Sequence, residues 1–361
     1  ETNFVEPNLP EPTDYNQVLL DILSHENMAS REPIFEQYDK QVQGRIHTET
    51  GLADSGVMVP FNSEKYPEEI RNVGLALSTD HNPRHGLISP YWGGVNAVVE
   101  SMRNVAAVGA TPHALSDCLC FGNPEKPHQM WEFVESVRGV ADACHAITLK
   151  DSPNDATPII AGNVSFYNES KNGAIPPSPI VSCLGRLKDV NKTVPAHFQK
   201  SDSVILMVGE RKDELGGSVY YSVFDQLGAN IPKPNLEEMK NQIFALTDCI
   251  DDGLVLSCHD ISDGGVASAL SEMTIGNGIG CDVNIDSNLQ TDKILFSETG
   301  GFVLEVSSEN VGAISTTFSK YELDVFHIGN TGGIMIQLNS VLDMYVFDAK
   351  EAWTNGLREK L

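Results

Sequence analysis

Two polar turns, each entered by an apolar segment, restrict the fold of this chain more than any other feature. Residues 114–119 are largely apolar and lead into Phe121-Gly122-Asn123-Pro124, and residues 158–161 lead into Gly162-Asn163-Val164-Ser165. Between them, residues 128–144 carry apolar side chains at the three- and four-residue spacing of a helix. The sequence therefore predicts two strands that run into turns, with a helix over about 128 to 144 between them.

Oxygen donors accompany both turns. Asp117 offers a carboxylate, Asn163 a carboxamide and Ser165 a hydroxyl. Hard oxygen ligands suit Mg²⁺, which usually keeps waters and substrate phosphates in its shell, and glycine lets a backbone approach a ligand closely. Two purely structural turns would use the same residues, since Asn-Pro and Gly-Asn are common in loops. Both interpretations remain open at this level.

The net charge of the chain distinguishes between nucleic acid and small nucleotides as ligands. Lys and Arg number 24 and Asp and Glu number 50, which gives a net charge of −26. This argues against nucleic acid, whose binding depends on Lys and Arg at phosphates. A nucleotide remains compatible, because Mg²⁺ can bridge carboxylate and phosphate. No apolar run approaches the roughly 20 residues that span a bilayer, and no signal peptide is visible, so we expect a cytoplasmic protein that binds no membrane.

Seven cysteines are scattered through apolar segments, and none forms a CxxC pair. This pattern argues against a zinc site and indicates reduced, buried thiols. Cys118 and Cys120 are two residues apart, so on a strand they share one face.

The chain is long enough, at 361 residues, for two domains. Residues 1–12 contain three prolines and are expected to form a linker or tail; because no Met begins the chain, we expect a fragment of a longer protein. The first domain is predicted over 13–190 as two helices on one face of an antiparallel sheet. The second is predicted over 200–345, followed by a helix over 346–361. The elements expected in the first domain are helices over 14–23, 30–43 and 94–107, strands over 51–60, 74–79 and 179–185, and an exposed polar turn over 150–155.

Three further places carry polar groups whose role the sequence leaves open. Asp80 and Arg84 follow a strand, where they would either meet a ligand or pair with each other in the loop. Gly216-Gly217-Ser218 either binds an anion or caps a helix, and the cap is favoured. His259 could exchange protons near neutral pH, but we favour a structural role in which it is held between elements while neighbouring carboxylates cap the next helix.

The full strings resemble a known family. They are Asp117-Cys118-Leu119-Cys120-Phe121-Gly122-Asn123-Pro124-Glu125-Lys126-Pro127 and Ala161-Gly162-Asn163-Val164-Ser165-Phe166-Tyr167-Asn168-Glu169. Both resemble signatures of the small-type phosphoribosylformylglycinamidine synthases (PurL), with Cys120, Ala161 and Phe166 where that family has Asn, Gly and Leu. His259-Asp260-Ile261-Ser262-Asp263-Gly264-Gly265 resembles the signature of the wider superfamily that includes aminoimidazole ribonucleotide (AIR) synthetase. The likeness covers nearly all of residues 14–356.

This resemblance implies a fold and a reaction. The fold is an AIR synthase-like unit with an α/β sandwich as its second domain; two such units are fused in the family, and their first domains pair into a barrel. The chain resembles the C-terminal half. The family converts formylglycinamide ribonucleotide to its amidine, using ATP and Mg²⁺. Ammonia comes from a glutaminase subunit with a small bridging subunit.

The resemblance also implies site residues. Asp117 and Gly162 would contact ATP, Asn163 would hold Mg²⁺, and Ser165 would contact the ribonucleotide. No catalytic residue is expected here, because the family's catalytic His lies in the other half. Two alternatives are a PurM-like synthetase in which two copies of this chain rebuild the barrel, and a catalytically silent nucleotide-binding scaffold.

Overall fold

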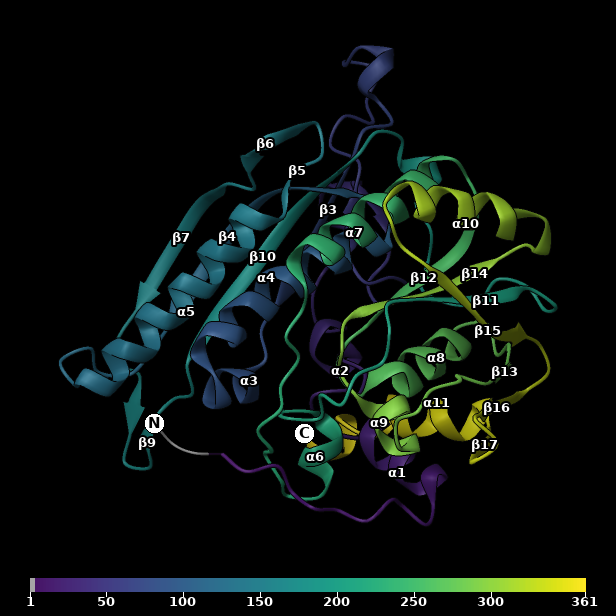
Figure 1. Ribbon diagram of the computed structural model, residues 1–361. Coiled ribbons are helices and arrows are strands. Elements are labelled where there is room, and N and C mark those ends of the chain that lie inside the picture. The colour runs from purple at the N-terminus through teal and green to yellow at the C-terminus, as the bar shows by residue number, and fades with distance from the viewer. Residues whose placement is uncertain (1–3) are drawn as a thin grey trace.

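The computed structural model describes residues 4–361; residues 1–3 of the predicted linker lie outside that range. Two sheets dominate the fold (Figure 1). The first has six strands in the order β1 (Ile46–Thr48), β2 (Gly56–Met58), β3 (Gly74–Asp80), β10 (Ser178–Leu187), β4 (Thr111–Cys120) and β7 (Ile159–Ser165).

The first sheet is mixed, which corrects the prediction of an antiparallel sheet. β10 pairs antiparallel with both β3 and β4, but β4 and β7 pair in parallel. A parallel neighbour needs a long crossover connection, and the 20-residue helix α5 (Pro127–Ala146) provides it. β10, which contains the strand predicted over 179–185, lies in the interior of the sheet.

Two helices cover one face of this sheet. α4 (Pro90–Ala107) and α5 lie side by side across it (Figure 1), and α4 buries Val95, Val98 and Met102 completely. The opposite face carries partly exposed side chains; Leu77 of β3 is 56% exposed. Among the described residues, no helix covers that opposite face.

Part of the second sheet is enclosed on both faces. β11 alternates between two cores: Val204, Leu206 and Val208 belong to one, and Ile205 and Met207 to the other. A strand buried on both faces needs such an unbroken apolar run. The strand order is β12 (Val255–Ile261), β14 (Gly301–Val306), β11 (Val204–Val208), β15 (Val325–Thr331), β13 (Cys281–Val283), β16 (Met335–Leu338) and β17 (Leu342–Tyr345).

Different helices make the two cores. α7 (Leu236–Asp251) and α10 (Val311–Lys320) share one core with α4, so that core runs from the first sheet to the second. The other core contains side chains from five helices: α1 (Tyr15–Leu23), α6 (Val219–Val223), α8 (Gly265–Ile275), α9 (Thr291–Phe296) and α11 (Val346–Asn355). α1 therefore packs with the second sheet, although the sequence analysis grouped it with the first.

Several local predictions differ from the structure. The helix predicted over 30–43 is only the four-residue α2 (Glu32–Phe35) and a 3-10 turn, η1 (Val42–Gly44). Residues 38–41 are exposed, so no buried face stabilises a longer helix there. The predicted polar turn over 150–155 belongs to an exposed hairpin of β5 (Thr148–Leu149) and β6 (Ser152–Ala156). The final helix ends at Asn355 and is followed by a 3-10 turn, η5 (Arg358–Lys360).

The remaining short elements are α3 (Pro83–Ile88), β8 (Glu169–Ser170), β9 (Gly173–Ala174), η2 (Glu68–Ile70), η3 (Val190–Lys192) and η4 (Ser308–Asn310). Among the described residues, no helix combines the length and the apolarity that crossing a membrane requires.

Candidate functional site

The four predicted site residues lie on two neighbouring strands. β4 and β7 run in the same direction, and their register places Asp117 opposite Gly162, Cys118 opposite Asn163, and Cys120 opposite Ser165. Both strands run toward the polar turns that the sequence analysis singled out. The structure thus brings the two signatures, 45 residues apart, into direct backbone contact at one edge of the sheet.

These residues divide between the two faces of the sheet. A β-carbon at Gly162 would stand 2.5 Å from Asp117 Oδ1, so the Asp117 carboxylate occupies the place of a Gly162 side chain and the two residues share one face. Asp117 is close enough to Cys144 of α5 to contribute, after burial, to a rise in the pKa of that thiol to about 12. The Asp117 carboxylate therefore lies on the helix-covered face, where burial raises its own pKa.

Asn163 and Ser165 lie on the opposite face, because successive strand side chains alternate. Asn163 Nδ2 is 3.6 Å from Cys118 Sγ, and Cys118 Sγ is 3.7 Å from Cys120 Sγ. Both thiols are half-buried, in contrast to the prediction of buried cysteines, which holds for the other five. Among the described residues, this weak sulfur contact is the one hydrogen bond of the Asn163 side chain, so its amide is available to a ligand.

The two turns are fastened to each other. Asn168 Nδ2 donates to the carbonyl oxygens of Phe121 at 3.0 Å and Ser165 at 2.9 Å. The backbone N–H of Tyr167 donates to the Gly122 carbonyl, and Lys126 pairs with Glu169 at 2.7 Å. The turns therefore form one continuous polar ridge at the end of β4 and β7.

A second polar region lies between the two sheets. It is a cavity of about 390 Å³ whose lining includes Asp80, Glu100, Asp260 and Asp263. Burial and the neighbouring carboxylates Asp263 and Asp260 raise the pKa of Asp80 to about 8. Burial likewise raises the pKa values of Asp260 and Asp263 to about 6 each. The cavity favours a ligand that carries positive charge.

The predicted loop ion pair between Asp80 and Arg84 is absent from the described residues. Arg84 instead donates to the carbonyl oxygens of Gly217, at 3.1 Å, and Gln226. Asp80 accepts a hydrogen bond from Asn104 Nδ2 at 3.2 Å and lines the cavity. The structure thus gives no support to the ion-pair alternative, and contact of Asp80 with a ligand stays a prediction.

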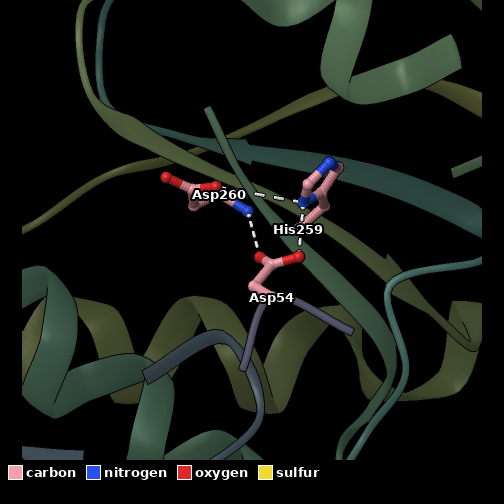
Figure 2. Close-up of side chains that lie close together, drawn as sticks. All are labelled: Asp54, His259 and Asp260. Carbon is pink, nitrogen blue, oxygen red and sulfur yellow. Dashed lines mark hydrogen bonds and ion pairs between the residues drawn. The ribbon is translucent and has the colours of Figure 1, made fainter. Parts of the chain in front are cut away.

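His259 is held between elements, as predicted (Figure 2). Its Nδ1 lies 2.7 Å from Asp54 Oδ1, and its Nε2 lies 3.2 Å from Glu272 Oε2. Glu272 also accepts from Trp353 Nε1 at 3.0 Å. Burial lowers the pKa of His259, but Asp54 and Glu272 outweigh it and hold the pKa well above its ordinary value. The network ties the 49–55 loop, α8 and α11 together.

The prediction that carboxylates from this signature cap α8 is wrong. α8 begins after Gly264 with no side-chain cap, and Glu298, from another segment, accepts the hydrogen bond of the Gly264 N–H at 2.9 Å. Ser218 does cap α6, accepting from the Tyr221 N–H at 3.1 Å, as favoured over anion binding.

Asp54, His259 and Asp260 are the one group of three candidate metal ligands among the described residues, with ligand atoms within 4.8 Å of one another. Asp54 links the other two residues: its Oδ1 lies 2.7 Å from His259 Nδ1, and its Oδ2 accepts from the Asp260 N–H at 2.8 Å (Figure 2). Sequence reasoning missed Asp54, Glu272 and Trp353 because each comes from a different segment; the one available signal was the acidic Glu272 within an apolar helix.

The comparisons with known proteins agree with this architecture. The family profile described as "AIR synthase related protein, N-terminal domain" matches residues 54–187, and its C-terminal counterpart matches residues 200–333. The chain belongs to the AIR synthase related proteins. The boundary between the two profiles falls in the segment that joins β10 to β11.

The relatives of this AIR synthase related chain include PurL subunits. It is 42% identical over 366 residues to the phosphoribosylformylglycinamidine synthase subunit PurL of Methanothrix thermoacetophila, covering 99% of this chain and 47% of that protein. The PurL subunit of Methanocaldococcus jannaschii is 37% identical, with 95% and 46% covered. The chain thus spans about half the length of these curated relatives.

Solved structures show the same fold at low identity. T. maritima PurL complexed with FGAR superposes with a TM-score of 0.72 at 18% identity, over 94% of this chain and 54% of that one. A shorter protein, tt0281 from Thermus thermophilus, superposes with a TM-score of 0.55 over 80% of this chain and 90% of its own. Two AIR synthase-type domains with mixed α/β sheets are therefore established.

Proposed function

We propose that this chain is the C-terminal half of a PurL-type amidoligase, which uses ATP and ammonia to convert formylglycinamide ribonucleotide to its amidine. One observation carries the proposal: the two signature strings, matched to PurL, pair in register on β4 and β7. Identity of 42% to a PurL subunit along 99% of the chain supports it. A cytoplasmic location and a domain division between residues 190 and 200 belong to the same proposal.

The two faces of the strand pair divide the binding roles. Asp117 and Gly162 contact ATP from the helix-covered face, where the Asp117 carboxylate lies against the Gly162 backbone. Asn163 holds Mg²⁺ and Ser165 orients the ribonucleotide from the opposite face. The oxygen donors fit Mg²⁺, which when bound neutralises charge at the phosphoryl group. The chain's own residues bind and orient; the groups that exchange protons with substrate are assigned to the other half.

The uncovered face of the first sheet is the docking surface in this proposal. Leu77 on this face is 56% exposed, and β7 is an edge strand whose far side is unpaired among the described residues. Pairing with the first domain of the other half would bury this face and close the sheets into a barrel. The glutaminase and bridging subunits are proposed partners, in line with the solved T. maritima assembly named PurLQS.

The same uncovered face suits a second copy of this chain. In that alternative the protein is a self-dimerising PurM-like synthetase; the tt0281 protein, covered over 90% of its length, shows that a single unit of this fold occurs as a chain of its own. A silent nucleotide-binding scaffold is the third candidate. Sedimentation of the chain alone separates dimer from monomer, since only the self-dimerising synthetase requires a dimer.

Calorimetry with MgATP and MgADP tests the main proposal, using the chain alone, the chain mixed with the other half, and the Asn163→Ala variant of each. Binding that is lost in the variant supports the assigned pocket. Binding in the mixture alone places the site between the halves, with these residues as one wall. Failure to bind nucleotide in every combination contradicts both synthetase readings, and turnover by the chain alone contradicts the division of roles.

A further inference from the structure

Two thiols lie together on the uncovered face of the first sheet. Cys118 and Cys120 are both half-buried, and their sulfur atoms are 3.7 Å apart. The other five cysteines are buried. Cys118 and Cys120 are therefore the thiols that a solute can reach.

The separation of the two sulfurs matches a metal-bridged pair. Thiolates bound to tetrahedral zinc at about 2.3 Å are about 3.8 Å apart, so one ion could bind both without moving the strand. A disulfide would require a sulfur separation of about 2.05 Å, between residues whose α-carbons, two apart on a strand, lie near the upper limit for such a bond. Of these two ways to join the sulfurs, metal binding fits the strand better.

Polar groups stand beside the pair. Asn163 Nδ2 is 3.6 Å from Cys118 Sγ, and rotating the amide would present its oxygen as a third ligand. Ser165 is the register partner of Cys120 on the same face. Two structural thiols that merely touch would need neither an exposed position nor polar neighbours.

We propose that Cys118 and Cys120 form a binding site for one thiophilic divalent cation such as Zn²⁺ or Cd²⁺. The two thiols lose their protons and bind through both sulfurs, and Asn163 and water complete the shell. This open, two-thiolate site differs from the closed four-ligand zinc site that the cysteine spacing argues against. The ion would also compete with Mg²⁺ for Asn163; that consequence alone rests on the proposed function.

Titration with Cd²⁺ in the absence of nucleotide tests the site, so its outcome does not depend on ATP binding. The ultraviolet thiolate-to-cadmium charge-transfer band should appear and saturate at one ion per chain. Cys118→Ser and Cys120→Ser should each weaken binding roughly tenfold or more, equivalent to about 1.4 kcal/mol. Cys144→Ala is the matched control and should leave the titration unchanged. No band, or an equal band in the Cys118→Ser/Cys120→Ser double variant, overturns the proposal.

A second measurement needs no substitution. Saturating Cd²⁺ should protect Cys118 and Cys120 of the parent chain from alkylation by iodoacetamide, measured by peptide mass. Unchanged labelling of both residues overturns the proposal even if the serine variants fail to fold. Competition with MgATP is measured only in a preparation that binds MgATP, so failure of the proposed function is distinguished from failure of the thiol site.

Discussion

Gly162 lies opposite Asp117 on the neighbouring parallel strand, and a β-carbon at Gly162 would stand 2.5 Å from Asp117 Oδ1. No real contact is that short, so the two positions constrain each other. The glycine is required by the aspartate beside it rather than by an unusual backbone conformation.

Gly162→Ala should therefore destabilise the β4–β7 edge by about 1–3 kcal/mol, the range for overpacking, and lower nucleotide affinity. Chemical denaturation and calorimetry measure the two effects. Gly312→Ala, where nothing lies within 4 Å of the added carbon, is the matched control. In the double variant with Asp117→Ala, stability should recover; a Gly162→Ala variant as stable as the parent would show that the two positions do not constrain each other.

Asn168→Ala should loosen the polar ridge. It removes the hydrogen bond to Phe121, which joins the two turns, and the bond to Ser165 within the second turn, for a loss of about 1–2 kcal/mol. Hydrogen exchange should rise in residues 121–126 together with residues 165–170, because the amide links both. Asn172→Ala, on the same loop but exposed, serves as the control. Increased exchange in only one of the two turns would contradict the link.

Asp80 should make stability fall as pH rises from about 7 to about 8. Burial and Asp263 raise the pKa of Asp80 from 3.8 to about 8, so the folded chain keeps a proton that the unfolded chain has lost. Stability then decreases with pH, by no more than about 1.4 kcal/mol per pH unit for one proton. The buried His81 and His85, whose pKa values burial lowers to about 4 and about 3, are neutral in this range.

Asp80→Asn should flatten this dependence and raise stability at about pH 8, measured by denaturation at each pH. Asp348→Asn, an exposed substitution on α11, should leave the slope of the parent intact. An unchanged slope in Asp80→Asn would remove Asp80 as its source.

His259→Gln should lower the free energy of unfolding by about 3 kcal/mol, because it leaves Asp54 and Glu272 without their shared partner. The pKa of His259 is raised in the folded state, so the stabilisation is fully present below the unfolded pKa and is lost as pH rises through the folded pKa. The difference between parent and variant should therefore be larger at mildly acidic than at strongly alkaline pH. Trp353→Phe, which removes one hydrogen bond of the same network, should cost about 1 kcal/mol; equal costs for both variants would contradict a charged His259.

The sequence by itself determined the local elements and the family. Helical spacing from Val95 to Ala106 predicted α4, and the apolar segments 114–119 and 158–161 predicted the strands that the structure shows as β4 and β7. The signature strings also predicted the four site residues that the structure places on β4 and β7. Their binding roles remain proposals. Where a segment lacked a buried face, as at 38–41, the local pattern predicted a helix that tertiary packing does not support.

Only the tertiary structure decided on which face of the sheet each of the four predicted site residues lies. The parallel register of β4 and β7 separates Asp117 and Gly162 from Asn163 and Ser165, because pairing between strands 45 residues apart is fixed by long-range packing. The acidic cavity has the same origin: Asp54, Asp80 and Asp260 come from three segments whose proximity no local pattern encodes. Their shifted pKa values arise from burial and mutual repulsion, and these exist only once the chain has folded.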